Sequence, residues 1–95
     1  MSPQKDSDRA EGVFTVSNEL GLHFRAAAMV VRISSEFSST IVISNGKTSA
    51  NAASVLDLMT LAASMGTRLT VVAEGEDAQD AVSALGALIA RNFAE

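Results

Sequence analysis

The alternation of hydrophobic and polar residues along the chain predicts a sheet of four strands. Residues 12–17 alternate with a period of two, which is typical of a half-buried strand. Residues 40–44 and 68–73 are short runs rich in β-branched residues, and each predicts a further strand. The Asn45-Gly46 pair predicts a two-residue hairpin turn, because both residues tolerate positive φ, so that residues 47–50 form an antiparallel partner strand.

Three helices are expected where apolar residues recur at intervals of three and four. The first spans residues 24–35, the second spans residues 51–65 with Gly66 closing it, and the third follows Asp77 as N-cap. Their expected apolar faces are, in order, Ala26, Val30, Ile33 and Phe37; Val55, Leu58, Met59 and Ala62; and Ala78, Ala81, Val82, Leu85, Leu88 and Ile89. Each helix shows a single apolar stripe. We therefore expect an α+β fold in the order βαββαβα, with a mostly antiparallel sheet covered by helices on one face.

The length and the two ends of the chain indicate one small domain. A chain of 95 residues can bury a core of its own. Residues 1–11 are polar, mixed in charge and hold the only proline, so we interpret them as a flexible extension before a folded domain over residues 12–95. No apolar run approaches the roughly 18 residues of a membrane span, and the N-terminus has no apolar signal core. We therefore expect a cytoplasmic protein without membrane insertion.

The composition excludes several classes of site and partner. The chain has no cysteine, which rules out disulfides and thiolate metal sites, and its single histidine is too few for an ordinary zinc site. The net charge of -4 and the absence of Trp and Tyr argue against nucleic acid, which needs basic faces and stacking rings. We expect no bound metal and no nucleic-acid partner.

The single histidine, His23, stands where a loop enters the first predicted helix. The first N–H groups of a helix lack internal partners, and the helix dipole places roughly half a positive charge there, so an anion is favoured. Arg25 adds a planar set of donors suited to phosphate. An imidazole of unperturbed pKa about 6.5 is largely neutral and nucleophilic near pH 7. Reversible phosphorylation would use these features, although a lone histidine at a helix start is more often a cap or a surface residue.

Two segments resemble the signatures of one known family. GLHFRAAA, residues 21–28, is similar to the active-site motif G-[LI]-H-A-R-P-A of HPr, the histidine-containing phosphocarrier protein of the phosphoenolpyruvate-dependent phosphotransferase system. SVLDLMTLAASMG, residues 54–66, is similar to the second signature of the family and stands at the same spacing from the first. The resemblance extends over residues 12–93 and implies an open-faced β-sandwich of four antiparallel strands under three helices.

The resemblance implies a role for each matching residue. His23 would accept a phosphoryl group from enzyme I on Nδ1 and pass it to an enzyme IIA-type acceptor, while Arg25 would steady the phosphoryl group. The chain would be a monomeric relay protein rather than an enzyme that releases a product, and it would need no bound cofactor. Ser54 aligns with the serine that an HPr kinase/phosphorylase modifies in many members. The helix after it, which contains Leu56 and Met59, serves in the family as a docking patch beside the active-site loop.

Two departures from the first motif bear on the choice of partner. Ala26 stands at the proline of the motif, which would fix φ and has no N–H. Alanine is a good helix former, so the helix should persist with a less rigid loop. Phe24 replaces the usual small residue beside the histidine and would either anchor a partner or restrict access to the ring. We favour the first interpretation.

Ser54 and the helix that follows it allow structural roles as well. Ser54 and Asp57 match the S-x-x-[DE] pattern of a capping box, in which Ser54 caps the helix, and Asn51 could be the cap instead. Asp57 stands where the family often has glycine, and its carboxylate would repel an incoming phosphate. Leu56 and Met59 could belong to the core, although Leu56 fits docking better.

Two other functions fit parts of the pattern. A regulatory paralogue of HPr, in a nitrogen-related or signalling relay, would keep the same fold and the same histidine chemistry. The order βαββαβ also occurs in ferredoxin-like regulatory domains of the ACT type, which bind small molecules. Such a domain needs neither His23 nor Arg25, and the last predicted helix has no counterpart in it. Phosphorylation of His23 separates a phosphocarrier from an ACT-type domain.

Overall fold

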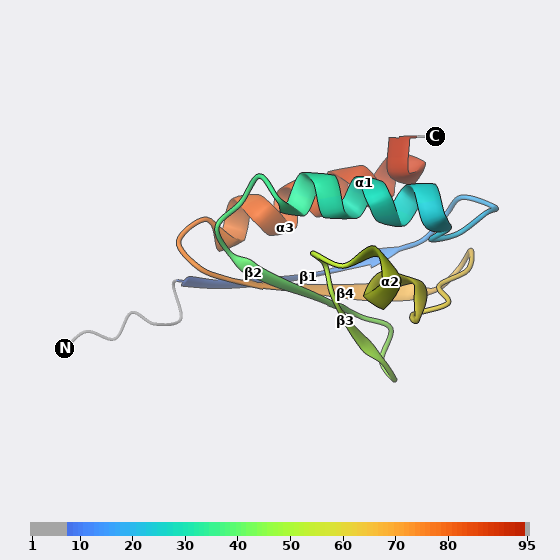
Figure 1. The fold of residues 1–95 in the computed structure, drawn as a ribbon, viewed down its shortest axis with the longest axis horizontal. Coiled ribbons are helices and arrows are strands. Elements are labelled where there is room, and N and C mark those ends of the chain that lie inside the picture. The colour runs from blue at the N-terminus through green and yellow to red at the C-terminus, as the bar shows by residue number, and fades with distance from the viewer. Residues whose placement is uncertain (1–7, 95) are drawn as a thin grey trace.

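Four antiparallel strands form one sheet in the computed structural model, which describes residues 8–94 (Figure 1). Along the chain these strands are β1 (Arg9–Thr15), β2 (Thr40–Ser44), β3 (Ser49–Asn51) and β4 (Arg68–Glu74). In space their order is β1-β4-β2-β3, and every neighbouring pair runs antiparallel. The first strand of the chain thus pairs with the last, which ties the two ends of the domain together.

Three α-helices accompany this sheet within the described residues: α1 (Phe24–Ser34), α2 (Val55–Met59) and α3 (Ala78–Ala90). Figure 1 shows α1 and α3 side by side along one face of the sheet, and α1 contacts both α2 and α3. A 3₁₀ turn, Asn92–Ala94, follows α3. Each helix in this part of the chain is too short or too polar to cross a bilayer. The predicted α+β fold class and the order of its strands and α-helices are confirmed.

The core lies between the sheet and the two long helices. The alternation of strand residues places one face of each strand inward, including Ile41, Ile43, Leu69, Val71 and Ala73. All predicted apolar residues of α3 are buried, as the single stripe required. The predicted stripe of α1 is buried at Ala26 and Val30 and partly buried at Ile33 and Phe37.

The start of β1 corrects the boundary predicted for the N-terminal extension. Arg9 already pairs with Glu74 in the ladder to β4, so residues 9–11 belong to the sheet and not to an extension. These residues look like a polar linker because β1 is an edge strand. The Arg9 guanidinium lies 3.3 Å from the Glu11 carboxylate and 3.6 Å from that of Glu74. The strand also ends at Thr15, two residues before the predicted end. The rest of the predicted extension, residues 1–7, lies outside the described residues.

The connection between β2 and β3 corrects the predicted hairpin turn. Ser44 pairs with Ser49, so the loop contains four residues rather than two, although the strands are antiparallel as predicted. Asn45 Oδ1 accepts the N–H groups of Lys47 and Thr48, each at 2.8 Å. In this loop only Gly46 has positive φ, at 96°. The asparagine side chain replaces a backbone partner and opens the turn, which the dipeptide alone did not reveal.

The second helix is shorter than predicted, because only Val55–Met59 of residues 51–65 is helical. The Thr60 hydroxyl donates to the Asp57 carbonyl at 2.6 Å, and Ala62 has a φ of 48°, which no helix continues through. Leu61 is buried, whereas Ala62, predicted on the apolar face, is exposed. Gly66 follows well after the helix and does not close it. Leu61 packs in the core from the turn that follows the helix.

The carboxylate at the start of α3 has partners other than its own helix. Asp77 is the N-cap residue, as predicted, but its side chain makes no capping hydrogen bond to α3. It accepts the N–H groups of Ser38 at 2.8 Å and Ser39 at 3.0 Å, and the Ser39 hydroxyl at 2.5 Å. The Ser39 hydroxyl, followed by the Ser38 N–H, lowers the pKa of Asp77 below its usual value. Asp77 therefore joins the start of α3 to the loop before β2.

Candidate functional site

The loop between β1 and α1 is held in place by backbone hydrogen bonds. Gly21 donates to the Asn18 carbonyl at 3.1 Å, and Leu22 donates to the Ala63 carbonyl at 2.9 Å. Gly21 has a φ of 66°, and a Cβ on it would collide with the Ala63 carbonyl oxygen. Only glycine fits this position, since it tolerates both the left-handed conformation and the close approach. The loop is thereby fixed against the segment that follows α2.

His23 is the N-cap residue of α1, with φ of -80° and ψ of 178°. Its Nδ1 accepts a hydrogen bond from the Ala26 N–H at 3.3 Å, and its side chain is partly buried. Since Nδ1 acts as an acceptor, the ring proton belongs on Nε2. The Nδ1 lone pair therefore lies at the positive end of the α1 dipole.

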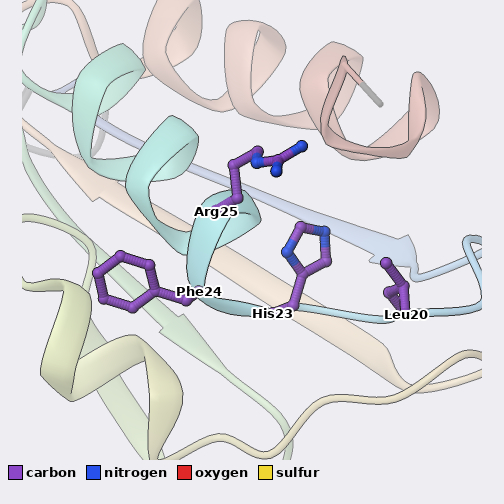
Figure 2. Close-up of a pocket in the computed structure, with 4 residues that line it drawn as sticks. All are labelled: Leu20, His23, Phe24 and Arg25. Atoms are coloured by element: carbon purple, nitrogen blue, oxygen red, sulfur yellow. The ribbon is translucent and has the colours of Figure 1, made fainter.

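Phe24 and Arg25 leave the start of α1 in different directions (Figure 2). The Arg25 side chain rises on the same side as the His23 ring, whereas the Phe24 ring points away from His23 toward α2. An open hollow of about 620 Å³ is lined by Leu20, His23, Phe24 and Arg25. Within residues 8–94 no carboxylate lies within ion-pair distance of Arg25. In this geometry Phe24 flanks the histidine without covering it.

Ala26, the residue at the proline position of the motif, is part of the site. Its side chain is buried in the core, and its backbone N–H is the donor to His23 Nδ1. A proline has no N–H and could not make this bond. The departure from the motif therefore changes the hydrogen bonding of the histidine, and the helix itself persists as predicted.

Ser54 caps α2, and this excludes Asn51 as the cap. The Ser54 hydroxyl accepts the Asp57 N–H at 3.1 Å. Asp57 Oδ2 accepts the N–H of Asn51 at 2.8 Å instead of that of Ser54. Only half of the predicted capping box is therefore formed, and the carboxylate secures the residue that ends β3.

The outer side of α2 presents apolar side chains to solvent. Leu56 is 78% exposed and Met59 is 37% exposed, whereas Leu58 is fully buried. Phe24, which points toward α2, is 64% exposed. The alternative prediction, that Leu56 and Met59 belong to the core, is therefore wrong. Both side chains lie at the surface. We call Phe24, Leu56 and Met59 the apolar surface; partner docking there stays a prediction.

Two residues of the site were missed in the sequence. Leu20 is 71% exposed and lines the hollow beside His23. Asn18 is buried, and its Nδ2 donates to the Gly21 carbonyl at 3.0 Å. The same carbonyl accepts the His23 N–H at 2.9 Å, so Asn18 helps to fix the backbone that carries the histidine. An asparagine before a glycine turn was the available signal, since asparagine side chains often bond to nearby backbone.

The described residues, 8–94, contain no group of three or more His, Cys, Asp or Glu side chains that could hold a metal ion. The groups that the structure places at the site are the His23 imidazole, the Arg25 guanidinium and the N–H groups at the start of α1. A nucleophilic nitrogen with donors around it is suited to carrying an anionic group. Together with the open-faced sheet, this arrangement agrees with the phosphocarrier class that the sequence resemblance predicts.

Comparison with known proteins supports this class. The family described as PTS HPr component phosphorylation site matches residues 10–91. The chain is 41% identical to phosphocarrier protein NPr of Shewanella violacea, over 92% of this chain and 96% of the relative. It is 40% identical to phosphocarrier protein HPr of Cupriavidus necator, over 85% of this chain and 91% of the relative. The crystal structure of HPr-C-His from Thermoanaerobacter tengcongensis superposes with a TM-score of 0.85 at 37% identity, covering 90% of this chain and 97% of that chain.

The chain belongs to the HPr family, the phosphocarriers of the phosphotransferase system. The predicted resemblance and the function as a phosphoryl carrier are confirmed. Members of this family act in the relay with enzyme I and enzyme IIA-type partners. Because the chain belongs to the HPr family, the alternative of an ACT-type regulatory domain is wrong.

Proposed function

We propose that His23 is the phosphoryl acceptor, that enzyme I is its donor and that an enzyme IIA-type protein is its acceptor. The observation that carries this proposal is the position of Nδ1 at the N-terminus of α1, beside the open hollow. An incoming phosphoryl group would meet a nucleophilic nitrogen, the positive end of a helix and a guanidinium in one place.

The transfer needs no general base in this arrangement. The Nδ1 lone pair attacks phosphorus, the new P–N bond forms, and the bond between phosphorus and the donor atom of enzyme I breaks with its electron pair remaining on the donor. The ring proton stays on Nε2, so both ring nitrogens are substituted and the phosphorylated ring is an imidazolium, whose positive charge partly offsets the negative charge of the phosphoryl group. The reverse sequence passes the phosphoryl group to the next protein.

Arg25 stabilises the phosphoryl group in this proposal. Its guanidinium lies on the same side of α1 as the His23 ring and has no ion-pair partner within residues 8–94. A guanidinium without such a partner can bind two phosphoryl oxygens at once. The charge of Arg25 is therefore available for the transferred group.

We propose that the apolar surface receives enzyme I and the acceptor in turn. Its exposed apolar side chains lie on α2 and at the start of α1, next to the histidine. A carrier must release each partner quickly, so a small apolar surface suits it better than a large interface. We expect the protein to act as a monomer, in the cytoplasm, where a chain without cysteine fits the reducing conditions.

A regulatory relay is the second candidate for the pathway. The similarity to phosphocarrier protein NPr over most of the chain favours it. Both candidates use His23 in the same way and differ in the protein that receives the phosphoryl group. Mixing the phosphorylated protein with enzyme IIA-type proteins of each pathway, and measuring which becomes labelled, distinguishes them.

Modification of Ser54 by an HPr kinase/phosphorylase stays a prediction. The hydroxyl is partly exposed, which would allow a kinase to reach it. Modification would have to replace the bond from the Asp57 N–H and bring a phosphate close to the Asp57 carboxylate. We expect this carboxylate to slow the reaction.

Intact-mass measurement after incubation with enzyme I and phosphoenolpyruvate tests the main proposal. The wild type should gain one acid-labile phosphate, and His23→Ala should gain none. Ser54→Ala, which alters the N-cap of the neighbouring helix, is the matched control and should be labelled like the wild type. Absence of label on the folded wild type with active enzyme I would overturn the proposal.

A further inference from the structure

We infer that the backbone N–H of Ala26 donates a hydrogen bond to the reacting centre in both states of the carrier. It bonds to His23 Nδ1 in the resting protein and to a phosphoryl oxygen after transfer. This inference rests on the proposed role of His23, and it concerns the stability of the phosphorylated state rather than the identity of the acceptor.

The position of Ala26 in α1 explains why its N–H is available. Ala26 is the third residue of the helix, and the N–H groups of the first turn have no partner within their own helix. The backbone ladder begins one residue later, where the Ala27 N–H donates to the His23 carbonyl at 2.8 Å. The N–H of Ala26 points instead to Nδ1 of the same histidine, at 3.3 Å. This distance is at the long end for a hydrogen bond, so the resting contact is weak.

Phosphorylation removes the acceptor that this N–H uses at rest. The new P–N bond takes up the Nδ1 lone pair, so the Ala26 N–H loses the acceptor that it has at rest. The phosphoryl oxygens are two bonds away from Nδ1 and are the nearest new acceptors. Since they are charged, a bond to one of them is shorter and stronger than the bond to the neutral ring. The N–H therefore stabilises the phosphorylated form more than the resting form.

This donor exists because the chain has alanine where the active-site motif of the HPr family has proline. Proline would keep the backbone in a helical conformation but has no N–H to donate. The substitution thus adds a donor at the nitrogen that we propose for phosphorylation. We expect the added donor to shift the phosphoryl-transfer equilibrium toward this carrier.

Two variants at the same position separate the N–H from the side chain. Ala26→Pro removes the N–H, whereas Ala26→Gly keeps it and removes the methyl group. Each folded variant is equilibrated with enzyme I at a fixed ratio of phosphoenolpyruvate to pyruvate, and the phosphorylated fraction is measured by intact mass. The equilibrium constant for phosphorylation should be about 5- to 10-fold lower for Ala26→Pro than for Ala26→Gly.

The amide resonance of Ala26 gives a second measurement that needs no variant. In the ¹H–¹⁵N spectrum of the wild type, this amide proton should move downfield on phosphorylation, because its acceptor changes from a neutral nitrogen to a charged oxygen. This readout decides the inference even if Ala26→Pro does not fold. Equal equilibrium constants for the two variants, or an amide proton that does not move downfield, would overturn the inference while the labelled wild type upholds the proposed function. A wild type that takes no phosphate would overturn both.

Discussion

The first turns of α1 and α2 have the same capping hydrogen bond but carry charges of opposite sign. At α1, Nδ1 of His23 accepts the N–H of the residue three positions later. At α2, the Ser54 hydroxyl does the same. The first turn of α1 has no acidic residue and contains Arg25, whereas the first turn of α2 contains Asp57. Both cap residues have an extended backbone, and the two helix starts differ mainly in charge.

This difference shows that the N-terminus of a helix is suited to an anion only when no acidic side chain of the helix already lies there. The dipole favours negative charge at both helices. At α2 the Asp57 carboxylate already occupies the first turn and accepts the Asn51 N–H at 2.8 Å. At α1 the hollow beside His23 and the charge of Arg25 favour an incoming phosphoryl group. The start of α3 gives a third arrangement, in which the Asp77 carboxylate binds another loop.

The largest effect is expected from Gly21→Ala, which disturbs the loop that places the start of α1. The new Cβ would meet the Ala63 carbonyl in a left-handed conformation, so the free energy of unfolding should fall by about 3 kcal/mol or more. Gly46→Ala is the matched control, because it also has positive φ but nothing lies near its Cβ, and it should cost about 1 kcal/mol. Urea unfolding of both variants measures the difference. Equal losses would contradict the tight contact at Gly21.

Reversing the charge at α1 should make its start resemble that of α2. Arg25→Glu should lower kcat/KM for phosphoryl transfer from enzyme I by about 100-fold, because a favourable bond is lost and a repulsive charge is added. The rate of phosphorylation at varied concentrations of the carrier measures this. Arg32→Glu, in the last turn of the same helix, changes the net charge equally and should stay close to the wild type. A similar loss in both variants would mean that only the overall charge matters.

Removing the cap of α2 should affect stability without affecting phosphoryl transfer. Ser54→Ala loses the bond to the Asp57 N–H, which should lower the free energy of unfolding by about 1 kcal/mol. The melting temperature should therefore fall by about 5 °C. Ser83→Ala, at an exposed position on α3, serves as the control and should not lower it. A fall in phosphorylation of His23 in folded Ser54→Ala would show that the two helix starts are coupled.

The smallest effect is expected at the start of α3, and it depends on pH. The Ser39 hydroxyl and the Ser38 N–H lower the folded-state pKa of Asp77, so the contribution of its carboxylate is complete above the unfolded-state pKa. It is lost as the pH falls through the lowered folded-state value. The stability difference between the wild type and Asp77→Asn should therefore shrink below about pH 4. Thermal unfolding across this range measures it, with Asp80→Asn as the control on the same helix. A difference that stayed constant down to about pH 2 would contradict the assignment.

The sequence predicted well those parts of the fold that depend on local patterns. The spacing of apolar residues located α1 and the buried face of α3, and β-branching located β2, because these signals arise within a few neighbouring residues. The position of His23 at a helix start followed from the same local pattern. The roles of His23 and Arg25 came from the motif and stay proposals that the labelling experiments test.

Long-range contacts decided what the sequence did not reveal. The polar residues 9–11 became strand because β4 supplied their hydrogen-bond partners. The second helix ended at Met59, and the positive φ of Ala62 turns the chain away from the helical path. Asp77 took Ser38 and Ser39 as partners across nearly forty residues of chain.

The sequence by itself determined the order of elements, the fold class and the histidine at the start of α1, since each follows from short-range periodicity and composition. Only the tertiary structure decided what surrounds that histidine. It brought the segment after α2 against Gly21 and turned Phe24 away from the ring. Such contacts depend on the packing of segments that are distant in sequence and on the direction of single hydrogen bonds, and a pattern of residue types specifies neither.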